Sequence, residues 1–268
     1  MKAIAAIAVN VFRESVRDKV LYNLVAFAIL LIGASYVLGQ LTAGQDVKII
    51  KDLGLSATSI FGLFIAVFIG IGLVSKEVER KSVYSLLPKP IHRYQLIVGK
   101  YAGLALTLVV NMAIMTLALY GVLLYMAWGV DPAVQRAWDA PALDPALLKA
   151  IALILTGLLL VTAIALFFST FSTPLLSAAL TFGFYIAGQF SVDLRNFDQV
   201  VDSKAAVFLA RGVYWVLPNL AQFDVKAQVV HGQAVPGTYL ALTMAYAVLY
   251  IAMLLVVAAF VFSKRDFK

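Results

Sequence analysis

The stretch from Ala150 to Val192 reads AIALILTGLLLVTAIALFFSTFSTPLLSAALTFGFYIAGQFSV and contains no charged residue. A helix needs about 20 apolar residues to cross the ~30 Å hydrocarbon core of a bilayer, so this stretch is long enough for two crossings. Proline cannot continue a helix, and the residue before it avoids helical angles. Pro174 therefore predicts a tight hairpin at 169–174, between membrane spans at about 149–171 and 174–192.

Apolar runs on either side of this hairpin predict four further spans, at about 20–41, 53–75, 101–128 and 239–263. The composition agrees, because 63% of the residues are hydrophobic and 13% are charged, whereas soluble domains have roughly 45–50% and ~25%. A soluble protein of this length cannot bury so much apolar surface in one core. We expect an all-α polytopic membrane protein, a single transmembrane domain over residues 1–268 with six membrane-spanning helices.

The placement of Lys and Arg predicts the orientation, because these residues concentrate in cytoplasmic loops. The N-terminal segment, the loop 76–100, the turn 169–174 and the C-terminal tail hold thirteen basic and five acidic residues, whereas the other loops hold eight and nine. Both termini are therefore predicted to be cytoplasmic, in a multi-pass protein of the cytoplasmic (inner) membrane. The net charge of +7 lies at the ends of apolar runs and not on one basic face, so no nucleic-acid partner is expected.

Two segments outside the spans have a helical pattern. The first nineteen residues form an amphipathic helix that can lie in the cytoplasmic membrane interface, unless they are a simple lead-in to the first span. In the extracytoplasmic loop 193–237, Ser203 to Leu217 is predicted to be a helix on the outer membrane surface, or else part of an ordinary structured loop. The apolar face of the N-terminal helix consists of Ile4, Ile7, Ala8, Val11 and Phe12.

Several kinds of site are missing from the sequence. The only Gly-Lys pair, Gly99-Lys100, lacks the spacing and the following Ser or Thr of a phosphate-binding P-loop. The two histidines, His92 and His231, are predicted on opposite sides of the membrane, and there is no cysteine, so no metal site is expected. The six predicted spans contain no ionisable group of the kind that proton- or sodium-driven carriers use. If the protein moves a substrate, the energy is expected to come from another chain.

The loop from Lys76 to Lys100 is rich in charges of both signs and has room for a short helix, a turn and a second helix. A mixed-charge cytoplasmic helix makes a good docking surface for a soluble partner. The alternative is that its Lys and Arg residues only set the topology while its acids keep the loop soluble.

A degenerate pattern runs through this loop, formed by Glu77, Glu79, Ser82, Leu86, Leu87, Pro90, Arg93, Gly99 and Lys100. With these residues the loop resembles the corresponding segment of the permease subunits of ABC-type exporters of the second permease class, in which permease and ATPase are separate chains. The family pattern runs from an acid through Ser or Thr, a Leu pair, Pro and a basic residue to Gly-Lys. The N-terminal segment Arg13–Lys19 and the tail Phe262–Phe267 also fit the family.

The resemblance implies an architecture and a mechanism. Two permease copies, identical or paralogous, form the translocation pathway as a dimer, and each docks an ABC ATPase subunit through a cytoplasmic coupling helix between spans 2 and 3. ATP and Mg²⁺ are bound by the ATPase, so this chain is expected to hold no cofactor, metal or catalytic residue. Periplasmic or additional membrane subunits are further partners that the resemblance allows. The implied coupling residues are Glu77, Glu79, Arg80, Lys81, Ser82, Pro90 and Arg93, flanked by Arg13, Glu14 and Arg17 on the N-terminal interfacial helix.

An alternative function is that of a membrane anchor or assembly factor that binds a cytoplasmic partner through the same loop without moving substrate. An intramembrane enzyme is not expected, because no paired carboxylates and no nucleophile–base set lie at membrane depth. The substrate stays open between lipid, peptide, drug, ion and copper or sulfur species.

Overall fold

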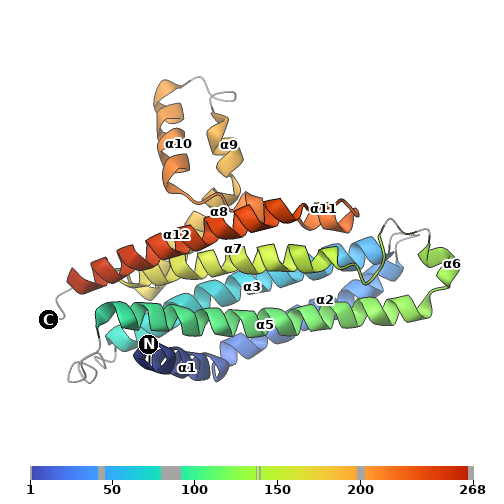
Figure 1. Ribbon diagram of the computed structural model, residues 1–268, viewed down its shortest axis with the longest axis horizontal. Coiled ribbons are helices and arrows are strands. Elements are labelled where there is room, and N and C mark those ends of the chain that lie inside the picture. The colour runs from blue at the N-terminus through green and yellow to red at the C-terminus, as the bar shows by residue number, and fades with distance from the viewer. Residues whose placement is uncertain are drawn as a thin grey trace.

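The computed structural model describes residues 2–41, 46–79, 92–136, 138, 140–197 and 203–264. These residues form helices, with no strand among them. Long helices run side by side along the molecule, and shorter ones lie at its ends and flank (Figure 1). The helices are α1 (Lys2–Val16), α2 (Lys19–Gln40), α3 (Asp46–Glu79), α5 (Arg93–Gly129), α6 (Pro132–Gln135), α7 (Ala146–Ser169), α8 (Pro174–Gln189), α9 (Ser191–Arg195), α10 (Lys204–Val216), η2 (Ala221–Phe223), α11 (Lys226–Val230) and α12 (Gly237–Lys264).

Five helices are long and apolar enough to cross a membrane: α2, α3 over Asp46–Ile71, α5, α7, and α12 over Gly237–Ser263. They match five of the six predicted spans. Both α3 and α5 extend further than predicted. The observed start of α3 places Lys51 on the helix, where its side chain is 1% exposed and its Nζ donates to the carbonyl oxygen of Pro141 at 2.8 Å.

The fifth predicted span, 174–192, differs most from expectation. The hairpin before it is confirmed, because α7 ends at Ser169 and α8 begins at Pro174. The helix then has 16 residues, about 24 Å at 1.5 Å per residue, which is shorter than the ~30 Å hydrocarbon core. The backbone N–H of Leu220 donates to Gly188 O at 3.0 Å, so the chain returning from α10 packs against the end of α8. The prediction of six full spans is therefore not confirmed.

Glycines on α3 allow the bundle core to pack closely. A Cβ at Gly54 would collide with Leu119 of α5, one at Gly62 with Leu158 of α7, and one at Gly70 would lie 2.7 Å from Ala165 Cβ of α7. In a bilayer the hydrophobic effect does not drive helices together, so they associate through close packing, and small residues let their backbones approach. These glycines recur every eight residues, and α3 therefore packs against α5 and α7 along much of its length.

The helices α9 and α10 form an arm that projects sideways from the middle of the bundle (Figure 1). The predicted helix 203–217 is confirmed as α10, Lys204–Val216. Two tyrosines of α12 hold the base of the arm: the hydroxyl of Tyr250 donates to Val216 O at 2.6 Å, and that of Tyr246 accepts from Asn219 N–H at 3.0 Å. Helix α10 presents large exposed apolar side chains along its length, among them Phe208, Leu209 and Trp215.

Candidate functional site

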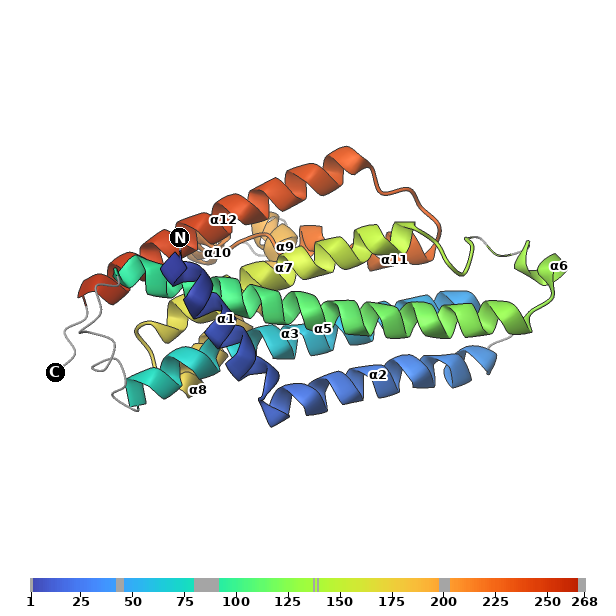
Figure 2. The ribbon, with the colours of Figure 1, turned by 60° about the horizontal axis from the view of Figure 1, so that its bottom comes forward.

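One end of the bundle brings together α1, the beginning of α5 and the end of α12, and we call it the terminal end (Figure 2). The opposite end, which carries α6 and the beginning of α7, is the loop end. Helix α1 crosses α5 at the terminal end. Its predicted apolar face is the face that packs on protein, since Val11 is buried and Ile4, Ile7 and Ala8 are partly buried.

Two glycines of α5, Gly99 and Gly103, form the contact with α1. A Cβ at Gly99 would lie 2.8 Å from Ile7 Cβ, and one at Gly103 would lie 2.6 Å from Ala8 O and 2.7 Å from Val11 Cβ. This Gly-x-x-x-Gly spacing lets two helix backbones touch. The N-terminal helix is therefore fixed to α5 by close backbone contact.

Arg93, the first residue of α5, joins this unit to the last helix. Its Nη1 donates to Phe262 O at 3.2 Å and to Ser263 O at 2.7 Å. The last carbonyls of a helix lack partners within the helix and carry partial negative charge. The guanidinium thus caps the end of α12 at the point where α5 begins.

A small buried cluster lies inside the terminal end, apart from the main core between α2, α3, α5 and α7. It draws side chains from four helices, and we call it the terminal-end cluster. Tyr101 adds a polar tie, because its hydroxyl donates to Leu159 O of α7 at 3.2 Å. The members of the cluster are Val11, Ile97, Leu104, Leu166, Ala258 and Phe262.

The predicted coupling residues are distributed around this end. Glu77 and Glu79 lie in the last turn of α3. Arg93 begins α5 and is bound to α12 as described. Arg13 and Glu14 are exposed on α1, and Arg17 is exposed just after it. The predicted residues Arg80, Lys81, Ser82 and Pro90 lie outside the described residues.

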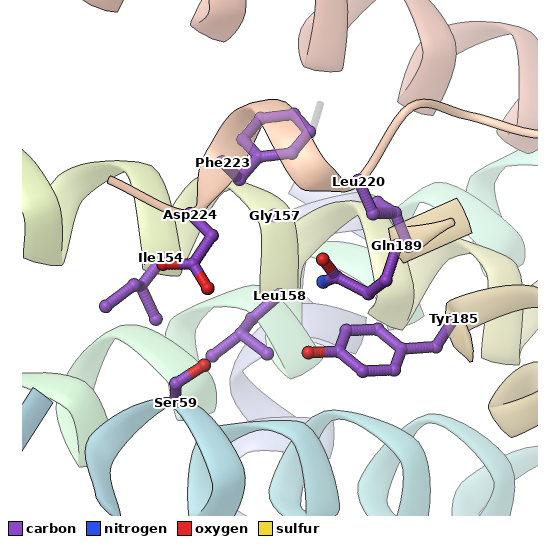
Figure 3. A pocket seen from close by; sticks show the side chains of 9 residues that line it. All are labelled: Ser59, Ile154, Gly157, Leu158, Tyr185, Gln189, Leu220, Phe223 and Asp224. Atoms are coloured by element: carbon purple, nitrogen blue, oxygen red, sulfur yellow. The ribbon is translucent and has the colours of Figure 1, made fainter. Parts of the chain in front are cut away.

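A second candidate site is a small pocket in the middle of the bundle, which we call the Asp224 pocket (Figure 3). Polar groups of Ser59 on α3, Tyr185 and Gln189 on α8, and Asp224 point toward the same space in Figure 3. The cavity measures about 30 Å³, enough for about two water molecules at 10–15 Å³ each. Apolar walls come from Ile154, Gly157, Leu158, Leu220 and Phe223.

The depth of this pocket follows from its contact with α7. Phe223 packs on Gly157, where a Cβ would lie 3.2 Å from the Phe223 ring. Gly157 is near the middle of α7, about 16 Å from its first residue at 1.5 Å per residue. Asp224 therefore lies level with the middle of α7, a helix long and apolar enough to cross a membrane, although it belongs to a loop. Lys226 pairs with it, with Nζ 3.3 Å from Oδ2.

The sequence analysis predicts neither the contact between α1 and α5 nor the Asp224 pocket. The Gly-x-x-x-Gly spacing of Gly99 and Gly103 is visible in the sequence. The sequence does not show that α1 is the helix that packs against these glycines. The family resemblance implies that Arg93 contacts the ATPase, whereas its hydrogen bonds to α12 join residues far apart in the sequence. The sequence predicts that Asp224 lies in the extracytoplasmic loop 193–237, because no local pattern shows how deeply a loop folds back into the bundle.

Comparison with known families decides the class of protein. A family model described as ABC-2 family transporter protein matches residues 5–267. The chain belongs to the ABC-2 transporter family. The match runs from α1 to beyond the end of α12 and confirms the resemblance seen in the charged loop. A search of curated proteins found no match.

As an ABC-2 transporter, the chain is a multi-pass membrane protein and the transmembrane component of an ABC transporter, a type of permease that works with an ABC ATPase. Among the described residues, no group of three or more His, Cys, Asp or Glu side chains is placed to hold a metal ion.

Proposed function

We propose that the chain is the permease of an ATP-driven exporter of the cytoplasmic (inner) membrane, paired with a second copy and coupled to a separate ABC ATPase at the terminal end. The observation that carries the proposal is the family match over nearly the whole chain, together with the assembly of α1, α5 and α12 into one unit at that end. Such a unit can pass a push from a docked ATPase to several membrane helices at once.

The docking surface in this proposal is the stretch between α3 and α5. Helix α3 ends in Glu77 and Glu79, and α5 resumes at Arg93. We propose that Glu77, Glu79, Arg80, Lys81, Ser82 and Pro90 contact the ATPase, with Arg13, Glu14 and Arg17 beside them. Arg93 then acts as the internal connection to α12 through its bonds to Phe262 O and Ser263 O.

The arm supports the proposed pairing of two permeases. Trp215 is 84% exposed and Phe208 is 77% exposed on α10. Large exposed apolar patches mark contacts with protein or lipid. We propose that the arm reaches a second copy, which covers part of this surface.

The test begins with co-purification from the native membrane and mass spectrometry. We expect an ABC ATPase in the purified complex, ATP hydrolysis by the complex, and none by the chain alone. Appreciable ATP turnover by the chain alone, or a complex without an ABC ATPase, would contradict the proposal. ATP-dependent movement of substrate out of the cytoplasmic compartment then separates an exporter from an anchor or assembly factor.

Charge reversal tests the docking surface. The triple variant Glu77→Lys, Glu79→Lys, Arg80→Glu is expected to lose the ATPase on purification while still inserting in the membrane. The matched control is Asp52→Lys, which lies on α3 near the loop end. Retention of the ATPase by the triple variant would show that docking occurs elsewhere.

A further inference from the structure

We propose that the Asp224 pocket is a water-accessible binding site at mid-membrane depth, reached through a polar vestibule from the loop end, and that it takes cationic or hydrogen-bond-donating groups of the transported substrate. The assignment of its ligand to the transported substrate rests on the proposed function. The water access and the ligand chemistry rest on the residues alone.

The first step concerns the surface that leads to the pocket. From Phe223, which packs on Gly157, the chain runs along α7 to Val235, whose carbonyl oxygen accepts from Lys149 Nζ at 2.9 Å. Lys149 lies in the first turn of α7, so this segment follows the loop-end half of that helix.

The second step concerns which side chains that segment exposes. Between residues 224 and 233, the buried side chains are valines, which pack on the bundle. Every exposed or partly exposed side chain longer than alanine is polar. These side chains are Asp224, Lys226, Gln228, His231 and Gln233.

Such a face is incompatible with lipid contact. Asp224 is 46% exposed and Lys226 is 20% exposed, and charged side chains at membrane depth face the bundle interior or a water-filled cavity. Helix α12 shows the contrast, because its exposed residues Leu242, Val248 and Leu249 are apolar. The polar face therefore borders water, and that water reaches from the loop end to about mid-depth.

The third step concerns what the pocket can bind. Asp224 is the only charged side chain among the nine that line it. The hydroxyl groups of Ser59 and Tyr185 and the amide oxygen of Gln189 add acceptors, and none of these side chains is fully buried. Lys226 is not part of the lining, although its pairing with Asp224 offsets part of the negative charge. Ammonium groups and other hydrogen-bond donors of small size are the matching ligands.

The experiment uses single cysteines, for which the chain is suited because it contains none. Ser59→Cys and Gln189→Cys place thiols at the pocket. Val248→Cys is the control on the lipid-facing side of α12, at the depth of the arm, since its neighbours Tyr246 and Tyr250 bind Asn219 and Val216. The probes are a cationic trimethylammonium methanethiosulfonate and an anionic sulfonate analogue. They are added to membrane vesicles of both orientations, and labelling is followed by mass spectrometry.

We expect both pocket thiols to react with the cationic reagent, from the loop-end side only, at least about 10-fold faster than Val248→Cys. Val134→Cys on exposed α6 identifies which vesicles present that end. Clefts lined by one sign of charge raise the association rates of oppositely charged ligands by roughly 10–10³. We expect the cationic reagent to react with the pocket thiols about 10-fold faster than the anionic one, near the lower limit of that range. Adding Asp224→Asn should remove that preference and leave water access intact.

Two outcomes would overturn the proposal. Pocket thiols as unreactive as Val248→Cys would show that no water reaches mid-depth. Equal rates for the two reagents, unaffected by Asp224→Asn, would show that the pocket does not select cationic groups. The labelling needs neither ATP nor a partner, so its failure is distinguishable from failure to find an ABC ATPase.

Discussion

The terminal end and the Asp224 pocket lie in one bundle and are built in opposite ways. At the terminal end, Gly99 and Gly103 bring two helix backbones into contact, and Arg93 binds the end of a third helix. Around the pocket, a loop lies on the middle of α7 and leaves polar side chains partly exposed. The first region is held together by backbone contact, whereas the second encloses a cavity of about 30 Å³ that polar side chains line.

This difference separates two tasks that a transporter must perform. A region that receives force from a partner must move as a unit, and close packing provides that because protein interiors transmit strain. A region through which a substrate passes must contain enough space for it and polar groups that replace its bound water. Substitutions at the terminal end should therefore alter the stability of the protein and its coupling to the ATPase. Substitutions at the pocket should alter the access of water and ligands to it.

The largest effect is expected from Gly103→Leu, which tests the close packing of α1. A side chain at this position would overlap Ala8 O and Val11, which lie 2.6 and 2.7 Å from an added Cβ. Overpacking of this kind costs roughly 1–3 kcal/mol, so we expect a lower unfolding temperature in detergent and faster tryptic cleavage at Arg13.

Gly121→Leu is the matched control, because it lies on the same helix and an added Cβ there meets nothing within 4 Å. The unfolding temperature and the rate of tryptic cleavage at Arg13 should stay near those of the unaltered chain in this variant. Equal behaviour of the two variants would show that α1 is not fixed to α5 through Gly103.

A smaller effect is expected from Arg93→Gln, which removes the tie between α5 and α12. Hydrogen bonds to charged groups contribute about 1.5–3 kcal/mol, and solvent exposure of Arg93 reduces this to about 1 kcal/mol. The amides of the last turn of α12 should then exchange with solvent about fivefold faster in the chain without its ATPase.

Arg13→Gln serves as the control, since Arg13 is exposed on α1 and has the same charge. If exchange in α12 stays unchanged in Arg93→Gln, then Arg93 does not hold α12 in solution. Its importance would then lie in contact with the ATPase, as the family resemblance implies.

The sequence predicted the features that depend on local pattern. Uncharged runs located the five long membrane helices within a few residues of most ends, and Pro174 located the hairpin between α7 and α8. The periodicity of 203–217 predicted α10 correctly. These predictions follow from the hydrophobic periodicity or from the geometry of proline. Both are local properties of the sequence, so no knowledge of a distant contact is needed.

What the sequence could not predict depends on contacts between distant segments. The apolar run after Pro174 continues to Val192, yet α8 ends at Gln189, where Leu220 binds Gly188 O. Asp224 follows a loop that packs onto Gly157, so its depth is set by tertiary contact and not by its neighbours in the chain. The family resemblance identified the charged loop, but it did not reveal that Arg93 binds within the chain.

The smallest effect is expected from Tyr250→Phe, at the junction where the arm meets α12. The Tyr250 hydroxyl donates to Val216 O at 2.6 Å, and loss of one such bond costs about 0.5–1.5 kcal/mol. Hydrogen exchange in the last turn of α10 should rise severalfold, with little change in the unfolding temperature. Tyr22→Phe, at an exposed position on α2, is the control. Unchanged exchange in α10 would mean that burial of Leu217 and Leu220 holds the base of the arm without this hydrogen bond. The arm would then resemble the terminal end in being fixed by packing, and the contrast between the two regions would be confined to the Asp224 pocket.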